Sequence, residues 1–556
     1  MSSRPSHLRV FTASRIHTMD PGRPTATAVA VADGSIVSVG SLESMQPWLR
    51  RVPHTIDDTY ADRVILPGFI DPHTHLRTSG TFAGLNYVGP IDVGHPDALP
   101  PLSSRDQVIS RLKGLVEAGG ASTEPVLCWG YDPATQAGHL DRDLLDQVSD
   151  TVPIWVCAYA PHIVYVNTPM LALIGVDEES NFHGLGRYPD GRLNGWFVET
   201  AAVSAALRPV ARMVYREGFG RVALSRMGAT ARAAGVTTTA DMGWGLEDFE
   251  REWNDHRAAI DEGDLPLRVM LVPFEPSLNR KFGTDALAAR DSWVSRGDKR
   301  LSVHGVKFIN DGSYPSMTLK IGAPGYLDGE HGLTGEIPWE DVYDRMLPYW
   351  KSGVQIHSHA NGDATIDMTL DVLSRLQLAH PRFDHRFVIE HYSLSSPAQA
   401  RRLAALGGMA SVNAYFVRFR AQMHADAGFG PDKSEATARL GSLERAGAQF
   451  AIHSDFNLVV APMAPLVVAE IAVNRIGADG TTVLAPGECI SVERALRAIT
   501  VDAAHVLNRD NEIGSIEAGK LADFAVLDDD PFEVDPSRIG GVGVVGTVLA
   551  GEPTGR

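Results

Sequence analysis

Residues 64–76 read VILPGFIDPHTHL, and the fold prediction begins from this stretch. It opens as a short apolar run of the kind that forms a buried strand, and it ends in the pair His73 and His75. Alternate side chains of a strand point to the same side, so Asp71, His73 and His75 are predicted to share one face. Two imidazoles on one face can hold one metal ion.

From Val64 onward, short apolar runs alternate with longer helical patterns. Such alternation is typical of βαβ units and a parallel sheet. The runs occupy residues 64–71, 125–130, 153–160, 235–242, 267–274, 303–311, 354–360, 387–393, 407–413 and 448–455. With this many runs, some of them in insertions, an α/β fold with a (β/α)8 TIM-like barrel is favoured over an open doubly wound sheet. No Gly-rich dinucleotide fingerprint supports the open sheet.

The two ends of the chain have a different sequence pattern. Residues 8–66 are short strand patterns, and Asp33-Gly34 between two alternating apolar runs is a hairpin signal. After a helical pattern at 491–508, the chain returns to short apolar runs punctuated by Gly and Asp. We predict a small β-sandwich domain built from both chain termini and a barrel with insertions between them. The predicted bounds are residues 1–66 with 509–556 for the first domain, and 67–508 for the second.

Composition excludes several classes of protein. Of the 556 residues, 44% are hydrophobic and 21% are charged, so the chain is predicted to be globular. Fifty Lys and Arg against 68 Asp and Glu leave a formal net charge of −18, which disfavours nucleic acid and membrane partners. Three widely spaced cysteines indicate no disulfide framework, and the N-terminus lacks the apolar core of a signal peptide. We expect a soluble cytoplasmic protein, and a homo-oligomer by the base rate for large enzymes.

Ligand-capable side chains recur on later strand runs. The alternation of side chains places Lys307 and Asp311 on one face of the run at 303–311, which is treated as a single strand. It also places His357 and His359 on one face of the next run, where His357 is expected to support the site rather than bind a metal.

Two further runs end in groups that can bind a metal or move a proton. FVIEH ends in His391, and FAIHSD ends in Asp455. In a barrel of this type, the C-terminal ends of the strands meet at one mouth, where active sites lie. Groups delivered from several strand ends to one mouth are the arrangement expected for metal-assisted hydrolysis.

Six stretches carry a resemblance to a known family: PGFIDPHTHL, VKFINDG, HANGD, VIEH, HSD and GSIEAGKLADFAVLD. With them the chain resembles the amidohydrolase superfamily, in particular its amidohydrolase-3 branch of exoenzyme-like amide hydrolases and N-substituted formamide deformylases. The resemblance extends over residues 8–535. It implies a centre with one or two Zn²⁺ ions per chain, or other divalent metals.

The resemblance also assigns roles to single residues. The metal ligands that it implies are His73, His75, Lys307, His359, His391 and Asp455. Lys307 corresponds to a lysine that can be carboxylated to bridge two metals, because an unmodified ammonium would repel them. The alternative for Lys307 is a buried lysine paired with Asp311. Asp455 is the predicted catalytic residue, which takes a proton from water and passes it to the departing amine.

One stretch departs from the branch. Residues 453–457 read His-Ser-Asp-Phe-Asn, where the branch usually shows Gly-Ser-Asp followed by a small or aromatic residue and Pro. The role of Asp455 is unaffected by this departure. The shape of the adjoining pocket is expected to differ from that of the branch.

Residues expected near the substrate come from several loops. The predicted substrate-binding residues are His162, Glu199, Asp311, Tyr314 and Tyr415. Loops at 322–332 and 423–433 are predicted to shape a pocket for a mainly apolar N-substituted amide. Alternatives stay open: His162 as a core histidine, Glu199 as a solvated residue at a helix start, and the two tyrosines as packing residues.

Together these observations predict a metal-dependent hydrolase that cleaves a linear C–N amide bond, of the N-formyl or N-acyl amine type, through a metal-activated hydroxide. Its partner is then a small-molecule amide. Alternatives are a superfamily deaminase and a cyclic-amide or carbamate hydrolase. Deamination is disfavoured because residues 360–363 after His359 read Ala-Asn-Gly-Asp, without the glutamate typical of those deaminases. A non-catalytic barrel scaffold is the alternative of a different class.

Overall fold

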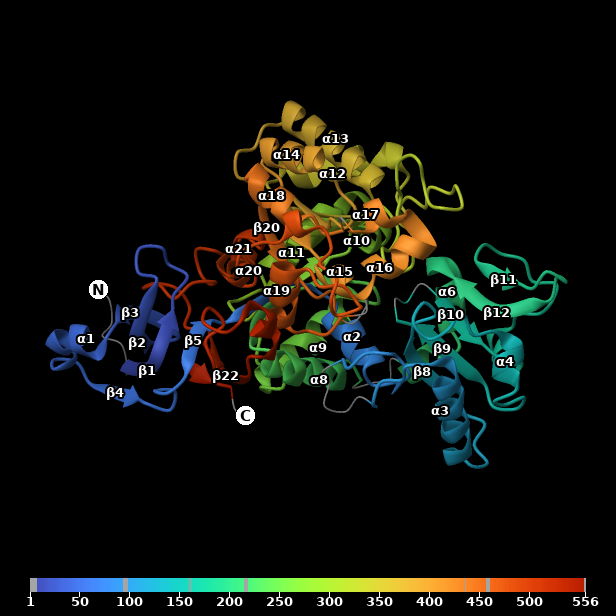
Figure 1. Ribbon diagram of the computed structural model, residues 1–556, viewed down its shortest axis with the longest axis horizontal. Helices are drawn as coiled ribbons and strands as arrows, with labels where there is room; N and C mark the ends of the chain where they lie inside the picture. Colours follow the sequence, from blue (N-terminus) through green and yellow to red (C-terminus); the bar gives the residue numbers. More distant parts are fainter. Residues whose placement is uncertain are drawn as a thin grey trace. The chain divides into compact units, whose positions relative to one another are not determined.

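The structure is a computed structural model that describes residues 8–93, 99–159, 161, 163–214, 219–435, 437–456 and 461–554. The chain divides into two units. Unit 1 comprises residues 1–74, 228–455 and 463–556, and unit 2 comprises residues 75–227 and 456–462. Both units mix helices and strands, in agreement with the predicted α/β class (Figure 1).

Strands from both ends of the chain form one mixed sheet in unit 1. They are β1 (Leu8–His17), β2 (Thr25–Ala32), β3 (Ser35–Gly40), β4 (His54–Asp57), β5 (Val64–Pro67), β21 (Phe524–Leu527), β22 (Val544–Leu549) and β23 (Glu552–Pro553). Their order is β23-β22-β21-β5-β1-β2-β3, with β4 beside β1. Because β21 pairs with β5, the late strands extend the sheet that the early strands begin. A separate β-sandwich domain with the predicted bounds stays a prediction.

The predicted hairpin at Asp33-Gly34 is confirmed. It joins β2 to β3, which pair antiparallel, and its two residues have φ values of 49° and 75°. A two-residue turn with both φ values positive matches the twist of the strands that it connects. Aspartate tolerates this left-handed backbone better than most residues, and glycine adopts it without steric cost.

The remaining strands of unit 1 are parallel and form two sheets. The first sheet, in the order β15-β14-β13-β6, contains β6 (Phe69–Thr74), β13 (Val236–Trp244), β14 (Arg268–Pro273) and β15 (Leu301–Val303). The second sheet runs in the order β16 (Val306–Ile309), β17 (Ile356–Ala360), β18 (Val388–His391), β19 (Met409–Val412) and β20 (Gln449–Ile452). A parallel bridge between Phe274 and Lys307 connects the sheets on one side. On the other side, the Asp455 amide donates to the His73 carbonyl at 3.0 Å.

The run at 64–71 divides at Gly68. Its first part, β5, lies in the sheet formed by the chain ends, and its second part, β6, lies in the first parallel sheet. A Cβ atom on Gly68 would lie 2.1 Å from the Thr237 Oγ1 atom, so only glycine fits this close approach. One continuous stretch therefore supplies both sheets.

The prediction of a single strand at 303–311 is wrong. β15 ends at Val303, and β16 begins at Val306 after Gly305, whose φ of 50° lies in the left-handed region. β15 pairs with β14, whereas β16 pairs with β17. Because glycine breaks the strand and the chain changes sheets there, Val303 and Lys307 do not share one strand face.

Unit 2 contains two of the predicted strand segments, residues 125–130 and 153–160. They form β8 and β9 of a sheet ordered β11-β12-β10-β9-β8-β7, so they belong to an insertion and not to the parallel sheets of unit 1 (Figure 1). Its strands are β7 (Asn86–Tyr87), β8 (Val126–Tyr131), β9 (Ile154–Ala158), β10 (Ile163–Val166), β11 (Leu185–Arg187) and β12 (Leu193–Val198). Its helices are α2 (Leu76–Phe82), α3 (Arg105–Ala118), α4 (Arg142–Asp146), α5 (Thr168–Ile174), α6 (Glu199–Leu207) and α7 (Ala211–Val214). α8 (Phe219–Ala233) leads back to unit 1.

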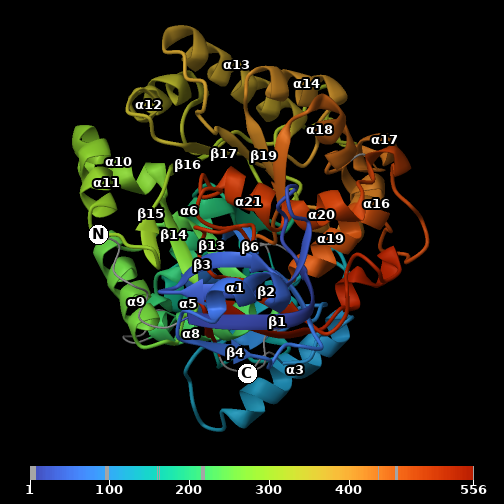
Figure 2. The same cartoon turned by 90° about the vertical axis from the view of Figure 1, so that its left-hand side faces the viewer.

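The helices of unit 1 largely follow its parallel strands along the chain. They are α1 (Leu42–Leu49), α9 (Phe249–Asp261), α10 (Glu275–Phe282), α11 (Ala286–Val294), α12 (Trp339–Lys351), α13 (Asp363–Ala379), α14 (Pro397–Ala405), α15 (Tyr415–Phe419), α16 (Ala421–His424), α17 (Pro431–Glu435), α18 (Leu440–Ala446), α19 (Pro465–Asn474), α20 (Val492–Ala498) and α21 (Val501–Val506). Figure 2 shows α12, α13 and α14 outside the second parallel sheet. The helical pattern at 491–508 thus forms two helices with a break between them. Among the described helices, none has the length and apolar character needed to cross a lipid bilayer.

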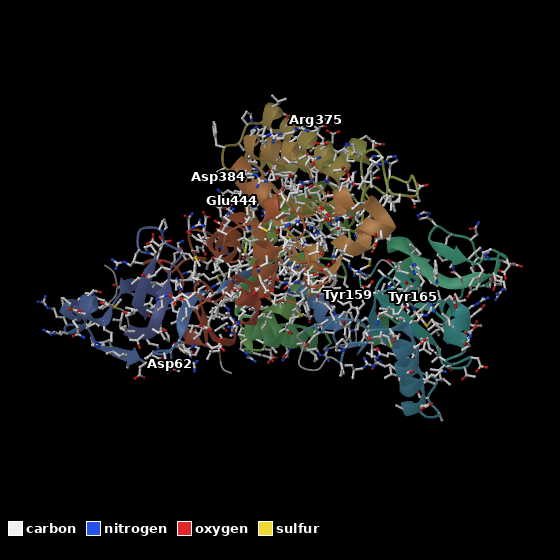
Figure 3. The ribbon with its side chains drawn as sticks, in the orientation of Figure 1. Asp62, Tyr159, Tyr165, Arg375, Asp384 and Glu444 are labelled. Atoms are coloured by element: carbon white, nitrogen blue, oxygen red, sulfur yellow. The ribbon has the colours of Figure 1, made fainter. Side chains whose placement is uncertain are left out.

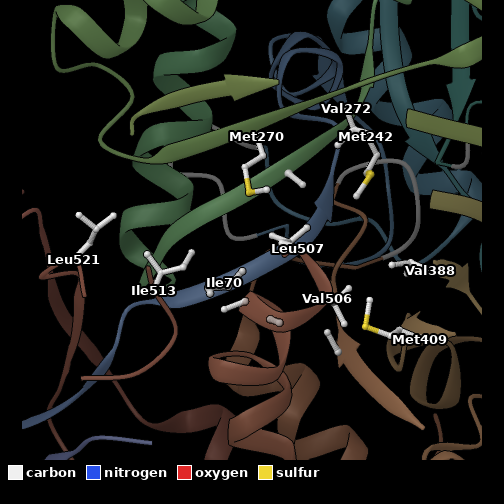
Figure 4. Close-up of a cluster of buried hydrophobic side chains, with 14 residues drawn as sticks. Ile70, Met242, Met270, Val272, Val388, Met409, Val506, Leu507, Ile513 and Leu521 are labelled. Carbon is white, nitrogen blue, oxygen red and sulfur yellow. The ribbon is translucent and has the colours of Figure 1, made fainter. Parts of the chain in front are cut away.

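Strands of both parallel sheets contribute to one hydrophobic core. Figure 4 shows Ile70 of β6 and Met270 of β14 in the same cluster as Val388 of β18 and Met409 of β19. Val506, the last residue of α21, and Leu507, which follows it, also belong to this cluster. Ile70, Val388 and Met409 stand at or near the first residue of their strands, whereas Met242 and Val272 lie near the last residues of β13 and β14.

A buried ion pair ties β14 to the sheet of the chain ends. Arg268 Nε and Nη2 donate to the two carboxylate oxygens of Asp523 at 2.6 and 3.0 Å, and both side chains are buried. We expect Arg268→Met to lower the free energy of unfolding by about 3–5 kcal/mol, because it leaves a buried carboxylate without its cation. Urea denaturation measures this change. Arg402→Met, which breaks an exposed pair with Asp371, should cost less than about 1 kcal/mol. Equal losses in the two variants would contradict the prediction.

Candidate metal centre

A buried carboxylate, Glu390 on β18, binds two histidines of neighbouring strands. Its Oε2 atom lies 2.6 Å from His73 Nδ1, and its Oε1 atom lies 2.7 Å from His357 Nδ1. All three side chains are buried. When Glu390 is ionised it can only accept, so each imidazole carries its proton on Nδ1 and keeps its lone pair on Nε2. Both rings are thereby fixed in the tautomer that binds metals through Nε2.

The ionised state of Glu390 has a clear electrostatic cause. Burial alone would raise the pKa of this carboxyl group, but the hydrogen bond from His357 and the charge of Lys307 outweigh it and lower the pKa to about 2. Lys307 lies on β16, and its Nζ atom is 3.4 Å from His73 Nε2. Burial lowers the pKa of Lys307 to about 8, against the opposing charges of Glu390 and Asp455.

Asp455 lies between two of the predicted ligands. Its Oδ1 atom is 3.8 Å from His73 Nε2, and its Oδ2 atom is 3.6 Å from His391 Nδ1. Both Asp455 and His391 have left-handed backbones, with φ values of 54° and 71°. Such backbones are uncommon outside glycine and are retained at sites where the surrounding structure requires them.

His391 is the central ring of the group. The centroid of its ring is 4.6 Å from that of His73, 4.5 Å from that of His359 and 5.1 Å from that of His453. Burial, followed by the neighbouring cationic groups, holds the pKa of His391 well below its usual range. Burial also lowers the pKa of His453 to about 4. Metal ions bind the neutral form of imidazole, which these surroundings favour.

Asp71 of β6 binds the segment that follows β20. The backbone N–H of Ser454 donates to its Oδ1 atom at 3.2 Å, and the Ser454 hydroxyl donates to Oδ2. Burial raises the pKa of Asp71 to about 7 despite these hydrogen bonds. Asp71 therefore positions the residues beside it, His73 on one strand end and Asp455 on the other.

His359 and Asp311 meet at the ends of β17 and β16. His359 Nε2 lies 2.9 Å from Asn361 Nδ2, 3.1 Å from the Gly312 carbonyl oxygen and 3.3 Å from Asp311 Oδ1. The Asp311 carboxylate also accepts hydrogen bonds from the backbone N–H groups of residues 361 and 362. Asp311 thus fixes the loop after β17, and its substrate-binding role stays a prediction.

The two tyrosines predicted to bind substrate are buried. The Tyr314 hydroxyl is 2.8 Å from the Thr437 hydroxyl, and its ring stacks on Phe416 at 4.6 Å. The Tyr415 hydroxyl donates to the Ala464 carbonyl at 2.8 Å. These contacts agree with the packing alternative, and contact with substrate stays a prediction.

Three further predicted residues belong to unit 2. His75 follows β6 and directly precedes α2, two residues along the chain from His73. Glu199 begins α6, but its side chain is outside the described part of the structure. His162 lies outside the described residues altogether. Their roles as a metal ligand and as substrate-binding residues stay predictions.

Sequence reasoning missed Glu390 and His453. Glu390 immediately precedes His391, and the alternation of a regular strand would aim the two side chains to opposite faces. The left-handed backbone at His391 removes this restriction, and both side chains reach the same group. The signal for His453 was its departure from the pattern of the branch.

The donors present fit a divalent metal ion. Imidazole nitrogen and carboxylate oxygen are the ligands that Zn²⁺ takes in catalytic sites. Within the described residues, His391 Nδ1 is buried and makes no hydrogen bond. A buried polar atom without a partner is unfavourable, and a metal ion would supply partners here.

Comparisons with known proteins identify a family and relatives of the chain. A family model described as "Amidohydrolase family" matches residues 61–554. Protein LONG AFTER FAR-RED 3 of Arabidopsis thaliana is 28% identical over 532 residues, which cover 93% of this chain and 86% of that protein. N-substituted formamide deformylase of Arthrobacter pascens is 24% identical over 577 residues, which cover 97% of this chain and 96% of that protein. An uncharacterized metal-dependent hydrolase from Pyrococcus horikoshii OT3 has a TM-score of 0.73 at 20% identity, over 95% of this chain and 99% of that one.

Proposed function

Because the chain belongs to the amidohydrolase family, we propose that it is a metal-dependent hydrolase of a linear C–N amide bond in an N-formyl or N-acyl amine. The observation that carries the proposal is that His73, His391 and Asp455 meet at strand ends. The Asp455 carboxylate lies within 4 Å of a ring nitrogen of each histidine. Four strands contribute to the group when Lys307 is included. Such a cluster at the carboxyl ends of parallel strands is where barrel enzymes place their chemistry.

We further propose that the two parallel sheets of unit 1 make one (β/α)8 barrel. The hydrophobic core shared by the two sheets supports this closure, as does the hydrogen bond from the Asp455 amide to the His73 carbonyl. The Phe274–Lys307 bridge supports it on the opposite side. In such a barrel, the eight strands are β6, β13, β14, β16, β17, β18, β19 and β20, and β15 is an extra strand beside β14.

The residues proposed to hold one or two Zn²⁺ ions are His73, His75, Lys307, His359, His391 and Asp455. A bound ion supplies a water molecule that loses a proton near neutral pH. The ion would also polarise the amide carbonyl. Lys307 serves as a bridging ligand only after carboxylation of its amine, because the ammonium form repels a metal. Its burial and its position 3.4 Å from His73 Nε2 support that role.

Asp455 is proposed to carry the proton. As the attacking water adds its oxygen to the carbonyl carbon, Asp455 accepts one proton from it. The same carboxyl group then gives that proton to the amide nitrogen while the C–N bond breaks. The products are a carboxylic acid, which is formic acid for an N-formyl substrate, and an amine. Glu390 and Asp71 keep the neighbouring groups in place throughout.

The proposed substrate class rests on similarity to the deformylase of Arthrobacter pascens over nearly the whole chain. Deamination, hydrolysis of cyclic amides or carbamates, and a non-catalytic scaffold are the competing proposals. A small-molecule partner, a cytoplasmic location and assembly as a homo-oligomer remain predictions from composition and family.

The proposal is tested by measuring amine release from a panel of substrates. Zinc-loaded protein is incubated with N-substituted formamides, N-acyl amines, cyclic amides, carbamates and aminopyrimidines. We expect amine release from a formamide or acyl amine, its loss after treatment with a chelator, and its return on adding zinc. Ammonia from an aminopyrimidine alone would establish a deaminase instead. No turnover of any class by metal-loaded protein would favour the scaffold.

A further inference from the structure

His453 lies within the group of predicted metal ligands, although the sequence patterns assign it no role. It is the first residue after β20, and its backbone N–H donates to the Val412 carbonyl at 3.1 Å. Its side chain is buried. The imidazole stacks on His73 with the ring centroids 4.7 Å apart and an interplanar angle of 19°. One ring nitrogen from each of His73, His391 and His453 lies within 4.8 Å of the other two.

Other buried histidines show what a structural imidazole requires. His256 Nδ1 lies 2.7 Å from the Glu252 carbonyl oxygen, and His385 Nε2 lies 2.9 Å from the Leu406 carbonyl oxygen. In the described part of the chain, by contrast, neither ring nitrogen of His453 makes a hydrogen bond of normal geometry, although the Ser411 backbone is close enough to influence its pKa. Burying an imidazole without such partners is unfavourable, and an apolar side chain at the same place would avoid this cost.

Packing against apolar side chains does not explain the buried ring of His453, since its neighbours are polar. The two rings closest to it belong to His73 and His391, and the carboxylates of Asp455 and Glu390 are near enough to influence it electrostatically. His424 offers the comparison. It also has two buried nitrogens without a hydrogen bond of normal geometry among the described residues, but it packs against Tyr314 and Phe429. Packing in an aromatic cluster explains the ring of His424. The polar surroundings of His453 instead favour a role for its ring nitrogen as a metal ligand.

We infer that His453 is a metal ligand, and that His73, His391 and His453 present three imidazole nitrogens to one divalent ion with Asp455 as the adjoining carboxylate. This inference rests on the proposed function, because it concerns the same centre. A site with three nitrogens and one carboxylate suits Zn²⁺, Co²⁺ or Ni²⁺ and disfavours Mg²⁺, Mn²⁺ and Ca²⁺, which prefer oxygen. Metal–nitrogen bonds are about 2.1 Å long, so the stacked rings of His73 and His453 would turn and their nitrogens would move closer together on binding an ion.

Cobalt binding tests the inference without relying on activity. Metal-free wild type, His453→Phe and the matched control His424→Phe are titrated with Co²⁺ in competition with a chelator, and the visible absorption of the cobalt protein is recorded. Phenylalanine keeps a ring stacked on His73 but has no nitrogen. We expect His453→Phe to bind Co²⁺ about 10- to 100-fold more weakly and to shift the cobalt absorption. His424→Phe should match the wild type in both.

The outcomes separate the inference from the proposed function. Unchanged affinity and an unchanged cobalt spectrum in His453→Phe, with metal bound by the wild type, would overturn the role of His453 alone. No metal bound by the wild type would overturn the metal centre and the proposed function together. If His453→Phe does not fold, as judged by circular dichroism, His453→Ala is measured against His424→Ala with the same criteria.

Discussion

Asp455→Asn is expected to lower kcat for amide hydrolysis by about 10³-fold. The amide has nearly the shape of the carboxylate but cannot accept a proton from water or return it to the leaving amine. Asp455 lies 3.8 Å from His73 Nε2 and 3.6 Å from His391 Nδ1, so it is placed to serve the reacting atoms. The measurement is steady-state kinetics on a substrate found with the panel, at saturating zinc.

Two controls are needed to interpret the kcat of Asp455→Asn. Metal content must be measured in the variant, because loss of the ion would lower kcat without involving proton transfer. Asp62→Asn changes an exposed aspartate in unit 1 (Figure 3) and should leave kcat unchanged. If Asp455→Asn retains its metal and more than about one tenth of the wild-type kcat, Asp455 does not carry the proton.

Glu390→Gln is expected to weaken metal binding by about 10- to 100-fold. The Glu390 carboxylate accepts from His73 Nδ1 at 2.6 Å and from His357 Nδ1 at 2.7 Å. A glutamine has one accepting oxygen, and its NH₂ group can only donate to the second histidine. Loss of the negative charge makes His73 a weaker ligand, and where the NH₂ group faces His73 the proton of that imidazole moves to Nε2, the atom left for the metal. Competition with a chelator measures the affinity.

A matched variant separates this effect from a general loss of stability. Glu275 is also a buried carboxylate with two hydrogen bonds, from Arg345 at 2.9 and 2.5 Å, but it belongs to α10. Glu275→Gln should lower the free energy of unfolding and leave the affinity for metal unchanged. Equal affinities in Glu390→Gln and the wild type would show that Glu390 does not set the tautomers of His73 and His357.

Features that depend on alternation and on strand ends could be predicted from the sequence. His73, His391 and Asp455 close short apolar runs, and the structure brings them together at the ends of β6, β18 and β20. The hairpin at residues 33–34 was also predictable, because its residues tolerate positive φ values. Each of these features depends on local chemistry that a single sequence displays.

The features that escaped prediction depend on departures from regular backbone. Gly305 breaks a run that alternation treats as one strand, and the chain changes sheets there. The left-handed backbone at His391 brings Glu390 and His391 into one group, which alternation excludes for adjacent residues. His453 lies near His73 and His391 because the ends of three strands lie side by side. Tertiary packing sets that alignment, not the β-propensity of single residues.

Divalent metal per chain is the measurement that tests the central claim most directly. The protein is purified without chelators and without a histidine tag, incubated with zinc and bicarbonate, freed of unbound metal and subjected to elemental analysis. We predict at least one zinc ion per chain, and two if carboxylated Lys307 bridges a pair. A protein that folds correctly and retains no metal after this treatment would contradict the metal centre and the hydrolase function built on it.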